Sequence, residues 1–216
     1  MPQVTAVCRV HRLMPDAGTV GITAIDKRPV EEPVRVRSLG LYSDIQADRE
    51  NHGGVDQAVY AYADEDASWW AAELGRDVPP GLFGENLRTT GLPTSDAVVG
   101  EQWTIGADGL VLEATMPRTP CATFARRIGE KRWVRRFAEV AATGAYLRVV
   151  SNGLVRAGDR IEVSRRPSHG VTIREVFTGP TADQAHALLD AHASGEVVLS
   201  DKVSMIAHRV LNRLGA

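Results

Sequence analysis

Short runs of apolar and β-branched residues, each bounded by glycine, proline or aspartate, recur through the first three quarters of the chain. Runs of this kind predict β-strands. The predicted strands are 3–13, 34–39, 57–63, 86–90, 110–115, 145–150 and 160–164. Strands this short and this frequent are typical of a closed or half-closed barrel. The pattern therefore predicts a mainly β fold with a few helices.

Two segments among these strands show a helical spacing of apolar residues. Residues 65–74 form the first and stop before Gly75, a residue type that commonly follows the last turn of a helix. The second is 130–142, where Trp133 and Phe137 lie four positions apart. We expect both helices to bury one apolar stripe against the sheet.

The last fifth of the chain changes character. After one more strand-like stretch at 171–177 the pattern becomes helical, and Thr181 and Ser200 are each placed to cap a helix with one apolar face. We predict a β domain over residues 1–166 and a small helical module over residues 171–216. A module of about 40 residues is only marginally stable alone and should pack against the β domain.

Composition narrows the class of protein. The chain of 216 residues has 44% hydrophobic and 24% charged residues, and no apolar run approaches the roughly 20 residues that cross a bilayer. Its beginning shows no export signal, so we expect a cytoplasmic protein. A net charge of −2 argues against nucleic acid or a membrane surface as partner. Two cysteines, Cys8 and Cys121, are a poor basis for a disulfide framework.

Cys121 lies in a proline-flanked turn between an apolar strand and a stretch of good helix formers. If a helix begins at Ala122, the thiol lies near its positive end and near Arg118, and both lower the pKa of a thiol from about 8.5. A thiolate is a nucleophile and a soft ligand for thiophilic metals. The alternative is a buried cysteine that acts as a small hydrophobe, which also describes Cys8 in its alternating strand.

Three polar residues that could bind a metal precede a pair of glycines. Asp44, Asp48 and His52 recur every four residues and would share one face of a helix, which suits a hard metal. The pair Gly53 and Gly54 favours a loop instead, whose backbone could approach a ligand closely.

Two more segments leave binding and structural interpretations open. A glycine-rich turn carries Glu85 and Asn86, and a basic cluster around Lys27 could hold a phosphate or form a solvated strand face.

Together and in this order, these segments resemble the MOSC domain, the module also found at the C-terminus of molybdenum cofactor sulfurase, and in particular its stand-alone YiiM-like branch. The segments that carry the resemblance are GITAIDKRPVEEPVRV, GLYSDIQADRENHGGVDQAVYAY, GLFGENLRTTG, PRTPC and GAYLRVVSNGLVRAGDRIEV, followed by a helical tail. The resemblance implies a barrel-like β fold that binds molybdenum cofactor (molybdopterin), with Cys121 as the protein ligand to the metal.

The resemblance also implies an activity. Members of this branch resemble reductases of N-hydroxylated compounds, including hydroxylamine-type purine analogues, which take electrons from a separate redox protein. The protein would then supply ligand, orientation and field for the cofactor. The residues that match the family's motifs and would bind the cofactor are Lys27, at its phosphate, Asp48, His52, Gly53, Gly54, Glu85, Asn86, Arg118 and Cys121.

The chain departs from the family at several points. Ser43 replaces a usual glycine, Gln57 replaces a common lysine, and two extra residues lie between Ile22 and Lys27. No cysteine-rich iron–sulfur segment is present, so a reductase would need an external electron donor. Two other functions stay open: a sulfur carrier with a persulfide on Cys121, and a carrier that binds the cofactor without turnover.

Overall fold

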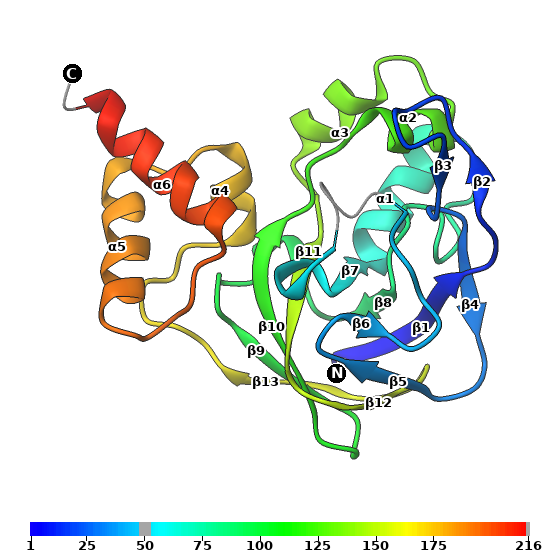
Figure 1. The fold of residues 1–216 in the computed structure, drawn as a ribbon, viewed down its shortest axis with the longest axis horizontal. Helices are drawn as coiled ribbons and strands as arrows, with labels where there is room; N and C mark the ends of the chain where they lie inside the picture. Colours follow the sequence, from blue (N-terminus) through cyan, green and yellow to red (C-terminus); the bar gives the residue numbers. More distant parts are fainter. Residues whose placement is uncertain (48–52, 215–216) are drawn as a thin grey trace.

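One large mixed sheet organises the protein, whose computed structural model describes residues 1–47 and 53–214 (Figure 1). Its strands lie in the order β13-β9-β10-β11-β7-β8-β1-β4. Their bounds are β1 (Gln3–Val10), β4 (Lys27–Val30), β7 (Val59–Ala63), β8 (Leu87–Thr90), β9 (Gln102–Ile105), β10 (Leu110–Pro117), β11 (Ala145–Ser151) and β13 (Ile161–Arg165). Two small sheets accompany it, formed by β12 (Gly153–Val155), β5 (Val34–Arg37) and β6 (Gly40–Leu41), and by β2 (Met14–Pro15) and β3 (Ile22–Thr23).

The large sheet curls but does not close into a barrel. All its neighbouring strands are antiparallel except β7 and β8. The segment at the start of β13 meets the start of β1 through one bridge between Gln3 and Arg160. Three backbone hydrogen bonds accompany it, from Val4 N to Asp159 O at 2.9 Å, from Gly158 N to Val4 O at 2.8 Å and from Ile161 N to Pro2 O at 2.9 Å. The rest of that edge of β1 pairs with β4. The prediction of a mainly β fold with helices is confirmed, and the closed form of the barrel is wrong.

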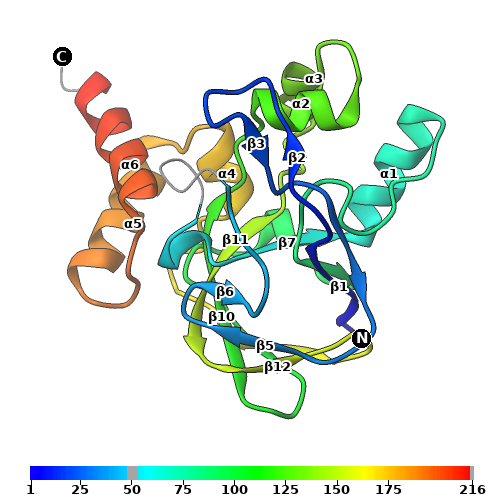
Figure 2. The same ribbon diagram turned by 45° about the vertical axis from the view of Figure 1, so that its right-hand side comes forward.

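Three helices pack at one end of the sheet over a cluster of aromatic side chains. They are α1 (Asp64–Leu74), α2 (Ala122–Ile128) and α3 (Trp133–Val140), and Figure 2 shows α2 and α3 beside β2 and β3. The buried aromatic residues between them are Tyr60, Tyr62, Trp70, Phe83, Phe124, Trp133 and Phe137. Short 3-10 turns at η1 (Val55–Gln57) and η2 (Thr94–Asp96) complete this part of the chain. The cluster fixes α2, the helix that follows Cys121.

The remaining helices, α4 (Ile173–Thr178), α5 (Ala182–Ala193) and α6 (Asp201–Leu214), group on one side of the sheet (Figure 1). The strand predicted at 171–177 is wrong, because Thr172 and Glu175 form a capping box that starts α4. The predicted cap at Thr181 is confirmed by a second capping box with Gln184.

The helical group shares its core with the sheet. Side chains on both sides of residue 170 contribute to one continuous cluster, in which Ile173, Leu188 and Val203 are completely buried. The division into domains 1–166 and 171–216 stays a prediction. In the described ranges, no helix combines the length and apolar character needed to cross a membrane.

Candidate functional site

A cavity of about 620 Å³ lies between the β2–β3 hairpin, the start of α2, the sheet and the first turn of α6. It brings together residues that are far apart in the sequence. The predicted site residues on its wall are Lys27, Gly53, Asn86, Arg118 and Cys121. Gly54 and Glu85 do not line it, and Asp48 and His52 lie outside the described residues.

Cys121 is the residue immediately before α2, with an extended backbone at φ −127° and ψ 173°. The helix begins at Ala122, which is the condition under which the thiol lies near its N-terminal end. The Cys121 side chain is half-buried and lines the cavity, so its sulfur lies where a ligand could reach it. Neither this residue nor Cys8 forms a disulfide.

Cys8 differs from Cys121 in every respect that matters for chemistry. It is completely buried in β1, and burial, followed by the nearby charge of Glu85, raises the pKa of its thiol to about 12. A protonated thiol with no access to solvent is inert as nucleophile and ligand. The interpretation of Cys8 as a core filler is therefore confirmed.

Arg118 places a buried positive charge at the site. Its side chain is 6% exposed, and the centre of its guanidinium lies 3.6 Å from the centroid of the Phe124 ring and 5.5 Å from that of Tyr60. Its Nη1 atom is buried and has no hydrogen-bond partner among the described residues. An unmade hydrogen bond of a buried group costs about 1–3 kcal/mol, and more for a charged one. Arg118 also lines the cavity, so the wall carries a buried cation whose chemistry suits an anionic ligand.

Lys27 forms a buried ion pair. Its Nζ lies 2.7 Å from Oδ2 of Asp44, and both side chains are less than a tenth exposed. The other oxygen of Asp44 accepts a bond from Val10 N at 2.8 Å. Ser43, the residue before Asp44, has a left-handed backbone at φ 61°, the conformation that glycine adopts most readily. The turn keeps a glycine-like shape and aims Asp44 inward at Lys27.

Asp44 does not form a metal site with other residues that the structure places. Across residues 1–47 and 53–214, no three histidine, cysteine or acidic side chains converge in a way that could hold an ion. Asp48 and His52, which the sequence groups with Asp44 as candidate metal ligands, lie outside those ranges. Asp44 instead serves as the counter-ion of Lys27.

Asn86 supports the cavity wall through its side-chain amide. Its Oδ1 accepts from Tyr60 N at 3.2 Å, while its Nδ2 donates to Cys8 O at 3.2 Å and to Asp44 Oδ2 at 2.8 Å. These bonds tie β1, β7 and the turn before β8 together. Asn86 thereby holds the segments that carry Lys27 and Tyr60 in place.

Glu85 lies behind the wall. It is completely buried, and its carboxylate accepts from the backbone N–H groups of Gly81 at 2.8 Å and Phe83 at 3.0 Å. It also forms a buried ion pair with Arg88. Glu85 shapes the turn that presents Phe83 and Gly84 to the cavity, and its contact with a cofactor stays a prediction.

The β2–β3 hairpin covers one side of the cavity and was missed by the sequence analysis. Asp16 anchors it to α2 by accepting three hydrogen bonds. Its Oδ1 accepts from Arg126 Nε at 2.8 Å, and its Oδ2 accepts from Arg126 Nη2 at 2.6 Å and from Thr123 Oγ1 at 3.0 Å. Asp16 and Arg126 are separated by 110 residues, and no local pattern joins them. The hairpin is thus tied to the helix that starts beside Cys121.

This tether should depend on pH. The bond to Arg126 lowers the pKa of Asp16 to about 2. Because the folded pKa lies below the unfolded value of about 3.9, the stabilisation is complete above that value and is lost as the pH falls through about 2. Since Arg126 is more than a third exposed, we expect Asp16→Asn to cost only about 0.5–1 kcal/mol at pH 7.

Urea unfolding of both proteins measures the effect. The difference between wild type and Asp16→Asn should shrink from pH 4 downwards, while Asp108→Asn at an exposed turn should change little at any pH. An equal difference at pH 7 and pH 3 would contradict the assignment.

Fold and site define a β-rich protein whose cavity presents a cysteine and a buried arginine. The chain belongs to the MOSC domain family, which matches residues 48–162. It is 34% identical over 152 residues to YflK of Bacillus subtilis (strain 168), covering 70% of this chain and 68% of YflK. It is also 31% identical over 174 residues to a protein named reductase from Gibberella moniliformis, covering 77% of this chain and 30% of that protein.

The fold has a solved counterpart. The crystal structure of YiiM from Geobacillus stearothermophilus superposes with a TM-score of 0.75 over 98% of this chain and 100% of that one, at 23% identity. The likeness covers both the sheet and the helical group.

Proposed function

We propose that this protein binds molybdenum cofactor and is an oxidoreductase that reduces N-hydroxylated compounds. The observation that carries the proposal is the presence of the Cys121 thiol and the Arg118 guanidinium on the wall of one cavity. MOSC domains are associated with this cofactor. The reductase of Gibberella moniliformis supports the reaction class, although the chain spans only 30% of that protein.

The residues present fit such a group. A cysteine sulfur is a soft ligand suited to molybdenum, and an arginine guanidinium is suited to phosphate oxygens. The cavity of about 620 Å³ falls within the roughly 300–1,000 Å³ typical of ligand pockets. The chemistry of one sulfur ligand and one buried cation would therefore suit the metal and the phosphate of a phosphorylated metal–pterin.

The cofactor, when bound, supplies reversible two-electron chemistry at its metal. Cys121 would hold the metal, and Arg118 would hold the anionic end. Tyr60 and Phe83 on the wall exclude water from the ligand, and the hairpin tethered by Asp16 covers it.

Electrons and protons must both reach the substrate. Cleavage of an N–O bond to an amine and water consumes two electrons and two protons. A separate redox protein would supply the electrons, since the two cysteines of the chain are too few for an iron–sulfur cluster.

The activity can be tested directly. Purified protein from a host that makes the cofactor should reduce a hydroxylamino purine to the amine with a reduced viologen as donor. Protein from a host that lacks the pterin pathway is the control and should be inactive. Equal rates in both preparations, or no reduction in either, would refute the proposed reaction.

A further inference from the structure

One face of α6 is exposed and carries positive charge. Lys202, Met205, Arg209 and Arg213 follow one another at spacings of three, four and four, which places their side chains on one stripe of the helix. All four are exposed, and Met205 is 57% exposed. The single acidic residue of this helix, Asp201, is its first residue. These four residues are called the α6 stripe below.

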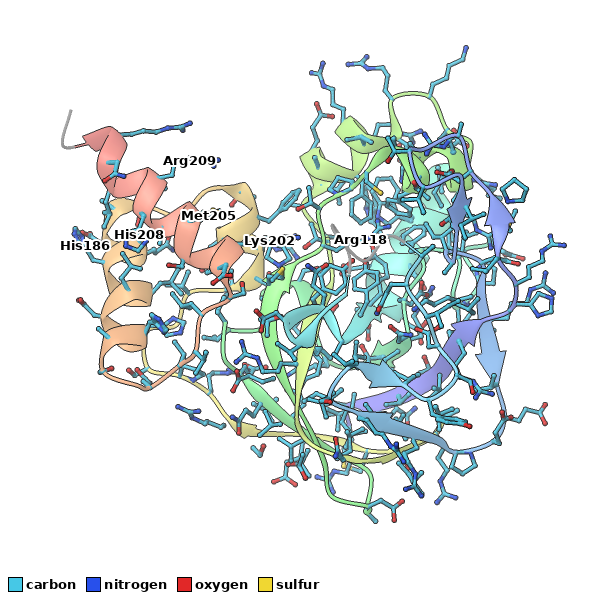
Figure 3. The ribbon with its side chains drawn as sticks, viewed as in Figure 1. Arg118, His186, Lys202, Met205, His208 and Arg209 are labelled. Carbon is cyan, nitrogen blue, oxygen red and sulfur yellow. The ribbon has the colours of Figure 1, made fainter. Side chains whose placement is uncertain are left out.

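The α6 stripe begins at the cavity and leads away from it. Lys202 lines the wall of the cavity that also holds Cys121. Met205, Arg209 and Arg213 line a shallow hollow further along the helix. In Figure 3 the labelled Lys202, Met205 and Arg209 follow one another along α6 in the direction away from the sheet. A partner that binds along the stripe would therefore lie beside the mouth of the cavity.

The outer part of the stripe carries charge that the fold does not neutralise. Within residues 1–47 and 53–214, neither Arg209 nor Arg213 forms an ion pair. By contrast, Nε of Arg135 on α3 lies 2.6 Å from Oε1 of Glu139. Two such guanidinium groups on a chain of net charge −2 create a local positive field that attracts an acidic partner. Arginine and methionine are also among the residues enriched in protein interfaces.

A membrane surface and a nucleic acid suit the stripe less well than an acidic protein does. The apolar face of α6 already packs inside the fold, where Val203 and Ala207 are completely buried, so this helix has no apolar face left for lipid. Nucleic acid needs a broad positive surface, whereas the stripe is one helix wide and has the apolar Met205 between its cations.

We propose that the α6 stripe is the docking surface for the electron donor, and that this donor is a small acidic flavoprotein of the flavodoxin type. The inference rests on the proposed function, in which a separate redox protein supplies electrons. Reduction of one N–O bond takes two electrons, and two flavoprotein hydroquinones supply them as each is oxidised to the semiquinone. The two protons come from the solvent. Arg209 and Arg213 pair with carboxylates of the donor, and Met205 packs against its surface.

Surface plasmon resonance tests the docking surface without any turnover. The full-length protein should bind an acidic flavodoxin at about 0.01 M ionic strength, where charges act over about 30 Å. The double variant Arg209→Glu, Arg213→Glu should bind at least tenfold more weakly, because its new carboxylates repel the donor. No binding by the wild type would overturn the proposal.

A second double variant controls for the change in net charge. Arg35 and Arg37 are exposed on β5, which lies far from α6 in Figures 1 and 2. Arg35→Glu, Arg37→Glu changes the net charge by the same amount and should bind flavodoxin as the wild type does. Equal affinities of the two double variants would overturn the proposal.

A comparison of two electron donors separates docking from chemistry. Reduced viologen is a small molecule that needs no docking surface, so Arg209→Glu, Arg213→Glu should reduce the hydroxylamino purine at the wild-type rate with it. With flavodoxin at low ionic strength the same variant should be at least tenfold slower than wild type, and about 1 M salt should remove this difference. Equal flavodoxin-driven rates at low salt would overturn the docking surface. No reduction with either donor would refute the proposed function, while the binding measurement would still decide whether the stripe docks flavodoxin.

The same variants test the other anionic partners. Phosphatidylserine vesicles and duplex DNA should bind the wild type and Arg209→Glu, Arg213→Glu equally weakly. Binding to either that depends on these two arginines, together with no binding to flavodoxin, would overturn the assignment of a protein donor.

Discussion

Replacing Glu85 by glutamine is expected to lower the free energy of unfolding by about 3–5 kcal/mol. Glu85 and Arg88 are both at most 1% exposed, so the change leaves the buried guanidinium with only the part-exposed carboxylate of Asp64, 3.5 Å away. The same carboxylate accepts the backbone N–H groups of Gly81 and Phe83, and a neutral amide cannot serve all these donors. The turn beside the cavity should loosen with it.

Urea unfolding measures this loss, and an exposed ion pair provides the control. Glu73 pairs with Arg136 on the surface, and Glu73→Gln should cost no more than about 1 kcal/mol. The double variant Glu85→Gln, Arg88→Met should be more stable than Glu85→Gln alone, because it removes a buried charge that has lost its buried partner. A cost for Glu85→Gln no larger than that for Glu73→Gln would contradict the assigned role.

Replacing Cys121 by alanine is expected to lower the rate of N–O reduction about 100-fold or more, since even indirect partners of a metal typically change activity by about 10–100-fold. The side chain is half-buried at the cavity wall, so the fold should persist. Steady-state kinetics with a viologen donor measure the effect.

Cys8→Ala is the matched control for this change. Cys8 is buried in β1 and bonds to Asn86 through its backbone N–H and carbonyl, which the substitution preserves. Its rate should equal that of wild type. Equal activity of the Cys121 variant would show that the sulfur has no part in turnover.

Local patterns were enough to predict most of the sheet. Central strands such as β7 and β10 carry dense apolar and β-branched runs between turn residues, and their positions follow from the sequence. Strand β4 is not among the predicted strands, although the basic cluster around Lys27 left a solvated strand face open. Its proline, Pro29, is accommodated because β4 lies at the edge of the sheet. At 171–177 the β-branched residues suggested a strand, but the capping box at Thr172 starts a helix.

The candidate site also combines features that follow from local sequence with features that depend on long-range packing. The turn before Ala122 and its cysteine are local features, and the sequence indicates them. The partners that act on the cavity from elsewhere are not local: Asp16 meets Arg126 across 110 residues, and Lys202 reaches the wall only because α6 packs beside β10. Glu85 shows the converse, since a conspicuous motif residue points at Arg88 and the turn backbone.

The most direct test of the account is the molybdenum content of protein purified from a host that makes the cofactor. Elemental analysis should find about one molybdenum per chain in the wild type and in Cys8→Ala, and almost none in Cys121→Ala. A wild-type protein without molybdenum, or a Cys121→Ala protein that retains it in full, would contradict the account.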